Sequence, residues 1–183
     1  MIFHNHVAEV PITATKSIVL VAMLTALSVA GRVLFTFIPN VTPVTAIVMI
    51  TTILMGVRYG LVNAVLSIVL SNMVMGMGIW TIPQIVSLVV VVVVTAVAIK
   101  PWFKSMPHWL VSLYAGMAGL LYGFVISLVQ APIFGYENFV SYYLAGLPFD
   151  LMHAGGNVAF YFVLAPILYP LLDKLLVRYM DGV

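Results

Sequence analysis

The sequence predicts an all-α membrane protein, a bundle of six transmembrane helices. Hydrophobic residues make up 64% of the chain and charged residues only 7%, whereas soluble domains carry about 25% charged residues. The apolar residues form runs of about 20, the length that crosses a bilayer as a helix. Proline, glycine and basic residues stand between the runs, where a chain leaves the membrane. We therefore expect one integral-membrane domain over residues 1–183.

The first three spans are predicted at residues 17–38, 43–59 and 61–76. Pro39 ends the first run, Gly60 separates the second from the third, and Gly76 ends the third, because both residue types interrupt helices. The third span is short, since a helix of about 16 residues covers only about 24 Å. We expect it to be accommodated by a neighbouring helix or to end in a loop at membrane depth.

The last three spans are predicted at residues 83–99, 108–131 and 147–176. Pro101 and Pro107 delimit the connection between the fourth and fifth spans, and Pro148 stands at the start of the sixth, at positions where prolines are tolerated. The sixth span is the longest, and six consecutive valines at 89–94 predict an apolar wall without chemistry.

Basic residues predict the orientation. With six spans, one side receives the termini and the connections after the second and fourth spans, with Lys16, Arg58, Lys100, Lys104, Lys174 and Arg178. The other side receives none, because Arg32 lies within a span. Cytoplasmic loops carry an excess of Lys and Arg, so both termini should be cytoplasmic and the connections 38–43, 76–83 and 131–147 should face outward. The N-terminus lacks the pattern of a cleaved signal peptide, so we expect the first span to be retained.

Polar side chains gather at the outward end of the predicted spans. The candidates for solute binding are Arg32, Asn40, Asn72, Trp80, Gln84, Tyr122, Gln130, Asp150, His153 and Asn157. Arg32 is the most informative, because a permanent charge at membrane depth is costly and usually faces a protein interior or a cavity. Its fork of donors suits a carboxylate, phosphate or amide. The alternatives are that Arg32 snorkels to the interface or pairs with Asp150, and that Trp80 is an interfacial belt residue.

The predicted sixth helix carries a polar stripe. Asp150, His153, Asn157 and Tyr161 are separated by three, four and four residues, so they share one helix face. Gly155 and Gly156 beside them would let another backbone or a ligand approach closely. The stripe therefore indicates a surface turned toward the bundle interior. It can serve a solute site, or it can hold the bundle together through interhelical hydrogen bonds.

The predicted first helix carries a stripe of small residues. Ala22, Ala26 and Ala30 are spaced by four, which lets another helix pack closely against them. Arg32 lies about 160° around the helix from Ala30. One helix can therefore present alanines to a partner protein and an arginine to a cavity. The alternative is ordinary packing against another helix of the same chain.

Several functions are disfavoured by the sequence. The chain has no cysteine, hence no disulfide or thiolate metal site, and we expect no bound metal. HExxH, GxSxG and phosphate-binding loop motifs are missing, and no nucleophile is placed beside Asp150 and His153, so we expect no catalytic residues and no enzyme. The basic residues form no run, which argues against a nucleic-acid partner. The inner halves of the spans lack the acidic residues and histidines of a proton relay.

The segments PNVTPVTA at 39–46, SNMVMGMGIWTIPQ at 71–84 and GLPFDLMHAGGN at 146–157, following the alanine stripe, resemble the substrate-binding S component of energy-coupling factor (ECF) vitamin transporters. The likeness spans nearly the whole chain. It implies a six-helix protein of the prokaryotic plasma membrane that binds a vitamin from outside. Its partners would be a transmembrane scaffold protein (the T component) and two ABC ATPases, which use ATP and Mg, so this chain itself would hold no cofactor.

The resemblance also implies two surfaces. The family's first-helix alanine motif contacts the scaffold protein and matches Ala22, Ala26 and Ala30. The family's solute site lies under loops that match residues 39–43, 76–83 and 131–146. ATP hydrolysis in the partner module would tilt the S component and release the solute inside.

The solute stays open at this point. The segment GMGIWTIPQ at 76–84 makes cobalamin the first choice. Pantothenate, whose carboxylate would meet Arg32, and a hydroxymethylpyrimidine-type solute are the alternatives. Two readings from other classes are a ligand-free membrane assembly subunit and an intramembrane enzyme that uses Asp150 and His153.

Overall fold

A computed structural model describes residues 15–134 and 139–180. Over these two ranges the chain forms six α-helices and two short helical turns, and no strand. The elements are α1 (Thr15–Leu34), α2 (Val44–Met55), α3 (Val57–Met75), α4 (Thr81–Val94), the π-helical turn η1 (Thr95–Ile99), the 3-10 turn η2 (Phe103–Ser105), α5 (His108–Phe134) and α6 (Phe139–Met180). The prediction of an all-helical protein is confirmed.

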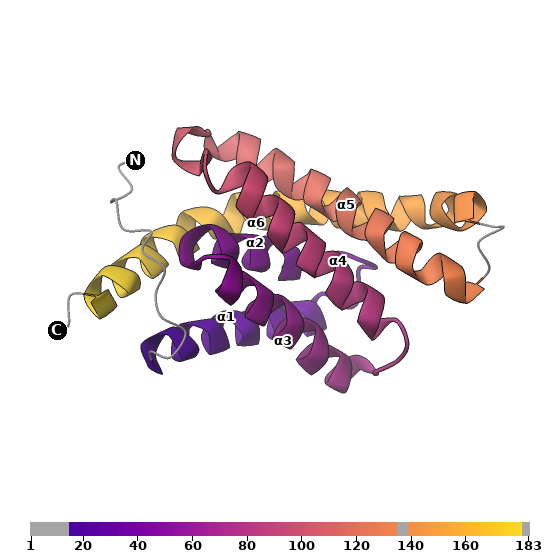
Figure 1. Ribbon diagram of the computed structural model, residues 1–183, viewed down its shortest axis with the longest axis horizontal. Coiled ribbons are helices and arrows are strands. Elements are labelled where there is room, and N and C mark those ends of the chain that lie inside the picture. The colour runs from indigo at the N-terminus through magenta and orange to yellow at the C-terminus, as the bar shows by residue number, and fades with distance from the viewer. Residues whose placement is uncertain (1–14, 135–138, 181–183) are drawn as a thin grey trace.

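The helices form one bundle, in which α1 begins and α6 ends at the same end (Figure 1). Helix α5 packs along α6 and α4, and α3 packs against α1, α2 and α4. Helix α2 lies in the middle and contacts α1, α3, α4, α5 and α6. The core therefore forms around α2, the helix with the most helical neighbours.

The central helix α2 is short and almost fully enclosed. All of its 12 residues except Leu54 are buried. Its Thr51 and Thr52 hydroxyls donate to the carbonyls of Ile47 and Val48 one turn earlier, at 2.8 and 2.7 Å. The Thr51 oxygen also accepts from Asn63 Nδ2 of α3, at 2.8 Å. Within the described ranges five helices are long and apolar enough to cross a membrane, and α2 is the exception.

The prediction of a short third span is wrong, because α3 has 19 residues and the short helix is α2. The chain turns at Gly56, whose φ of 103° lies in a region that favours glycine, and not at Gly60. Gly60 lies inside α3, where a Cβ atom would collide with the Thr52 side chain. This glycine therefore serves close packing between α2 and α3.

Two other predicted boundaries are corrected. Helix α1 ends at Leu34, four residues before the predicted end. Helix α6 begins at Phe139 and contains Pro148, so most of the predicted outer connection 131–147 is helical. A proline in the sequence predicts a helix boundary, but helices in a membrane tolerate proline because neighbouring groups satisfy the freed backbone carbonyls.

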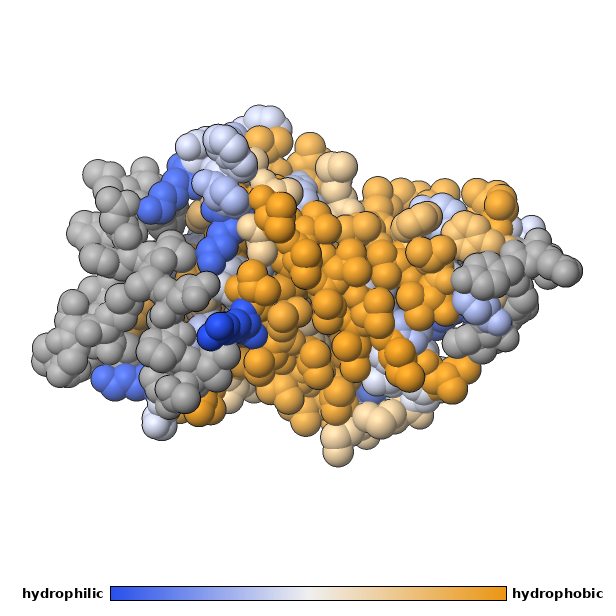
Figure 2. Space-filling model, in the orientation of Figure 1, coloured by the Kyte–Doolittle hydropathy of each residue, from blue (hydrophilic) through white to orange (hydrophobic). Residues whose placement is uncertain are grey.

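Apolar side chains cover the middle of the molecule, and hydrophilic residues gather at the end where α1 begins and α6 ends (Figure 2). We call this the basic end, after Lys16, Arg58, Lys100, Lys104 and Lys174, which lie on the elements that meet there. Lys100 follows η1, yet its Nζ would lie 3.5 Å from a Cβ atom at Gly56, in the turn between α2 and α3. The basic residues are thus concentrated at one end of the bundle, as the predicted orientation requires. The cytoplasmic placement of this end stays a prediction.

Candidate functional site

A polar cavity of about 50 Å³ lies at the end of the bundle opposite the basic end. It is lined by residues from all six helices and from the connection between α1 and α2, namely Arg32, Asn40, Thr42, Val44, Thr45, Ile68, Gln84, Leu88, Tyr122 and His153. Five of the ten candidates from the sequence, Arg32, Asn40, Gln84, Tyr122 and His153, are brought together here. We call this space the Arg32 cavity.

Arg32 lies in the last turn of α1. Its Nη1 donates a hydrogen bond to Ser71 Oγ on α3, at 2.7 Å. Ser71 donates in turn to the carbonyl of Ser67, at 2.5 Å, so its oxygen lone pairs are directed toward the arginine. In the described part of the chain no ion pair joins Arg32 to Asp150, and none of the residues lining the cavity is acidic. The cavity therefore holds a positive charge that no carboxylate of its wall compensates.

His153 ties α6 to the connection that covers the cavity. Its Nδ1 lies 2.8 Å from the backbone carbonyl of Asn40, and its Nε2 lies 3.1 Å from Thr45 Oγ1. Because a carbonyl only accepts, Nδ1 carries a proton, and in the neutral ring Nε2 accepts from the threonine hydroxyl. The ring also packs against Tyr122 of α5, with centroids 4.9 Å apart. The imidazole is thus held from three directions and linked to the wall of the cavity.

Asn40 is held in an uncommon conformation. Its φ of 60° lies in the left-handed region, which asparagine tolerates better than most residues. Its Nδ2 donates to the carbonyl of Phe149 on α6, at 3.3 Å. Asn40 is therefore attached to α6 at two points, by its own side chain and by its carbonyl to His153. Backbone strain of this kind persists where surrounding contacts fix it, often at ligand sites.

Asn72 does not line the cavity but holds a residue that does. It is buried at the end of α3, and its Nδ2 donates to Gln84 Oε1 at 2.8 Å and to Thr81 Oγ1 at 2.9 Å. With its oxygen engaged, the Gln84 side chain presents its amide N–H groups to other partners. Asn72 therefore sets the orientation of Gln84, which lines the cavity.

Four further candidates lie away from the Arg32 cavity. Trp80 is 46% exposed in the connection between α3 and α4. Gln130 accepts a hydrogen bond from the Tyr142 hydroxyl, at 2.6 Å. Asp150 and Asn157 are buried where α6 meets α5, against Gly123 and Gly119. The part these four play in solute binding stays a prediction.

The contact between α5 and α6 leaves polar atoms unpaired. Asp150 is 7% exposed and Asn157 is fully buried, yet Asp150 Oδ2 and both amide atoms of Asn157 have no hydrogen-bond partner within the described residues. His153, which lies between them on α6, is bonded to Asn40 and Thr45. The acid–base pair of Asp150 and His153 that an enzyme would need is therefore not formed.

Several residues of the site are not among the ten candidates. Ser71 and Thr45, which hold Arg32 and His153, belong to the polar residues that the sequence places at the outward end of the predicted spans. Val44, Ile68 and Leu88 complete the wall. These three are apolar residues in apolar helices, and nothing in the sequence separates them from the core.

The alanine stripe lies on the surface. Ala22, Ala26 and Ala30 are all exposed on α1, whereas Leu24 and Thr25 are buried on another face of the helix. Thr25 Oγ1 donates to Asn63 Oδ1 of α3, at 3.1 Å. These exposures argue against the alternative, in which the stripe packs against another helix of the same chain.

The fold and its apolar surface define a multi-pass helical membrane protein. The family model for the substrate-specific component of ECF transporters matches residues 16–170. The chain belongs to this family. Comparison with curated proteins and with solved structures finds no match.

Membership gives the chain its general role. It is a substrate-specific subunit of an ECF transporter, and this family works with the T component and the ATPases of such a transporter. This substrate-binding role supports the expectation from the sequence that the subunit is non-catalytic. Which solute it takes is a separate question, for which the Arg32 cavity is the relevant structure.

Proposed function

We propose that this subunit captures a small solute bearing a carboxylate or a comparable anionic group in the Arg32 cavity, and passes it to the ATP-driven module of the transporter. The observation that carries this proposal is a partly buried guanidinium facing a cavity whose wall has no acidic residue. A buried charge without a partner is costly. An anionic solute would supply the missing partner and would accept two parallel hydrogen bonds from the guanidinium.

A small solute would require far less widening of this cavity than cobalamin would. A space of about 50 Å³ holds one or a few water molecules, whereas a corrinoid is many times larger. Pantothenate carries the carboxylate that Arg32 would bind, and we place it first among the sequence-based choices. A hydroxymethylpyrimidine-type solute, which would use the amide of Gln84 and the hydroxyl of Tyr122, is the second.

Even a small vitamin requires the cavity to widen. The connection between α1 and α2 covers it and is attached to α6 through the two hydrogen bonds of Asn40. We propose that this connection moves aside when the solute enters and closes afterwards over Arg32. In the orientation indicated by the basic residues, the cavity opens outward and both termini are cytoplasmic, in a prokaryotic plasma membrane.

The exposed alanine stripe is the surface we assign to the T component. Small residues at a helix surface let a partner helix approach closely, and Ala22, Ala26 and Ala30 lie free on α1. Arg32 on the same helix reaches the solute. A partner bound to α1 would thus be one helix away from the cavity.

The test is binding by the isolated subunit. The chain is purified in detergent without T component or ATPases, its co-purifying small molecules are identified by mass spectrometry, and it is titrated with water-soluble vitamins including pantothenate, hydroxymethylpyrimidine and cobalamin. We expect one-to-one binding of a small carboxylate without ATP. If a correctly folded chain binds nothing in the panel and carries no solute, the proposal fails. If cobalamin binds and small carboxylates do not, the assigned solute class is wrong.

A further inference from the structure

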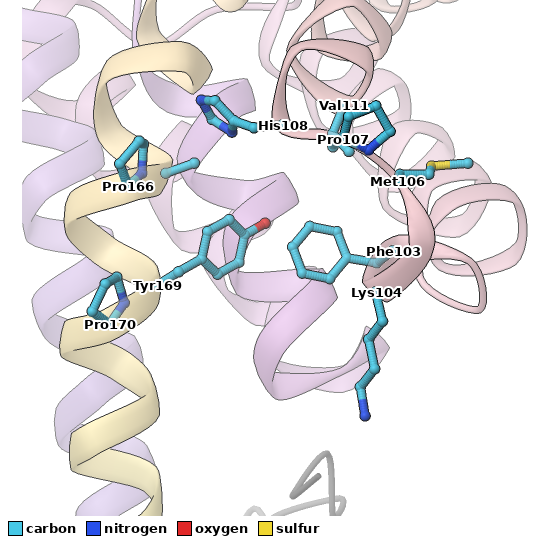
Figure 3. A pocket seen from close by; sticks show the side chains of 10 residues that line it. Phe103, Lys104, Met106, Pro107, His108, Val111, Pro166, Tyr169 and Pro170 are labelled. Carbon is cyan, nitrogen blue, oxygen red and sulfur yellow. The ribbon is translucent and has the colours of Figure 1, made fainter. Parts of the chain in front are cut away.

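A second and larger cavity lies near the basic end, between α6 and the start of α5 (Figure 3). Its volume is about 310 Å³. Phe103, Met106, Val111, Ala165 and Tyr169 supply apolar walls, and Lys104 extends from its rim. It shares no lining residue with the Arg32 cavity. Solute capture therefore leaves this cavity without an explanation.

Two prolines on α6 border the cavity (Figure 3). Pro166 has no N–H, so the carbonyl of Phe162 loses its partner within the helix. His108 at the start of α5 bonds this carbonyl through Nε2, at 3.1 Å. Pro170 leaves the carbonyl of Pro166 without a helical donor in the same way. The wall of the cavity therefore contains a backbone acceptor among apolar side chains.

The cavity lies on an apolar, exposed flank of the bundle. Helix α1, with its alanine stripe, packs on α2 and α3, whereas this cavity lies between α5 and α6. The surface around it is apolar and exposed, including Trp109 at 62% and Ile167 at 59%. In a membrane-spanning protein, such side chains contact acyl chains. A hydrocarbon chain can therefore enter this cavity directly from the bilayer.

Positive charge lies beside the apolar walls. Lys104 is part of the cavity rim and is exposed. Lys174 is also exposed, and it follows Pro166 and Pro170 at a spacing of four, so it lies one turn beyond the cavity on the same face of α6. The basic connections place this rim at the level of the lipid headgroups, where lysines attract anionic lipids.

We propose that this cavity binds one anionic phospholipid from the surrounding bilayer. The acyl chain would pack between Phe103, Met106 and Tyr169, and the phosphate would lie at Lys104 and Lys174. The lipid would fill the space between α5 and α6 and hold the two helices at a fixed separation.

Native mass spectrometry of the full chain, extracted from nanodiscs of defined composition, tests this assignment. Phosphatidylglycerol and phosphatidylcholine serve as probes, and retained lipids are counted after detergent washing. We expect one phosphatidylglycerol to be retained and phosphatidylcholine to be lost. The double variant Lys104→Gln, Lys174→Gln should bind phosphatidylglycerol about thirtyfold more weakly, and Lys16→Gln, at the same end on α1, should bind as the unmodified chain does.

A second variant addresses the apolar part of the site. Met106→Trp fills the cavity from a connecting segment, and it should remove the retained lipid whatever its headgroup. Elution volume and thermal unfolding temperature identify variants that fail to fold. The proposal is overturned if the unmodified chain retains no lipid in a one-to-one ratio, if both headgroups are retained equally, or if Lys16→Gln weakens binding as much as the double variant. Loss of T-component association in Met106→Trp, with no lipid on the unmodified chain, would assign the cavity to a protein partner instead.

Discussion

His153 on α6 lies 2.8 Å, through its Nδ1, from the backbone carbonyl of Asn40, a residue 113 positions earlier in the chain. The same ring reaches Thr45 on α2 and packs against Tyr122 on α5. The cover of the Arg32 cavity and three of its walls thus meet at one side chain. The geometry of the solute site therefore depends on contacts between segments that are far apart in the sequence.

Replacement of His153 should loosen the cover of the cavity. His153→Ala removes the bonds to Asn40 and Thr45 and leaves the buried Thr45 hydroxyl without that partner, which costs about 1–3 kcal/mol for an unsatisfied buried group. We expect faster solute dissociation and a lower unfolding temperature. Stopped-flow release of bound solute measures the first. His108→Ala is the control, because this histidine lies at the basic end, and solute release at its unmodified rate is expected there.

Two replacements of Asn40 separate backbone strain from side-chain bonding. Asn40→Gly removes the bond to Phe149 but adopts the positive φ without penalty. Asn40→Ala removes the same bond and also places a Cβ atom in the left-handed region, which costs about 1–2 kcal/mol. We expect Asn40→Ala to bind solute more weakly than Asn40→Gly. Equal dissociation constants for the two variants would show that the conformation of this residue does not affect the site.

Asn72 is predicted to act through Gln84. Asn72→Ala frees the Gln84 side chain and leaves a cavity at a buried position, so we expect weaker solute binding and a loss of stability of about 1–3 kcal/mol. Thr95→Val is the matched control, because Thr95 is a buried polar residue that bonds Tyr114, at 3.0 Å, outside the Arg32 cavity. Calorimetric titration and thermal unfolding of both variants test the assignment. A loss of solute affinity in Thr95→Val as large as that in Asn72→Ala would contradict it.

The contact between α5 and α6 should not tolerate a side chain at Gly123. A Cβ atom there would collide with the Asp150 carboxyl group, so Gly123→Ala should force the helices apart and destabilise the protein by about 1–3 kcal/mol. Gly155, on the same pair of helices, has no atom within 4 Å of an added Cβ. Gly155→Ala should therefore unfold at or above the temperature of the unmodified chain, because alanine favours the helix.

The alanine stripe should serve transport without serving solute recognition. Ala26→Leu places a large side chain on the exposed surface of α1 and should block association with the T component, and hence uptake, while the isolated subunit binds solute normally. Leu27→Phe, also exposed but about 100° away on the helix, should leave uptake unaffected. Solute binding and uptake are measured for each variant. Weakened solute binding by Ala26→Leu with normal assembly would disprove the docking role.

The helical class and most spans were predictable because lipid imposes long apolar runs on the sequence. The residues at which helices begin and end within these apolar runs are harder to predict. Gly56 and Gly60 look alike in the sequence, but one turns the chain and the other fits against Thr52. Pro148 has the sequence context of a helix boundary, but it lies inside α6. Whether a glycine or proline ends a helix or packs inside one depends on the residues that contact it in the folded protein. A single sequence does not show which residues these are.

The Arg32 cavity was predictable in part for a related reason. A polar residue in an apolar span indicates an inward-facing position, and this brought Arg32 and His153 onto the candidate list. The same signal named Asp150 and Asn157, which pack against glycines of α5 outside the cavity wall. Helical periodicity places a side chain on a face, but the rotation of that face toward a cavity or toward a neighbouring helix is set by packing.

The most direct test of the central claim is the affinity of the isolated subunit for its solute after loss of the Arg32 charge. Arg32→Gln keeps a donor for Ser71 and removes the charge, and Arg58→Gln at the exposed basic end is the control. We predict that calorimetry will show the dissociation constant rising about a hundredfold in Arg32→Gln, as when one partner of a buried charge pair is removed, and staying constant in Arg58→Gln. Unchanged affinity in a folded Arg32→Gln protein would contradict the account.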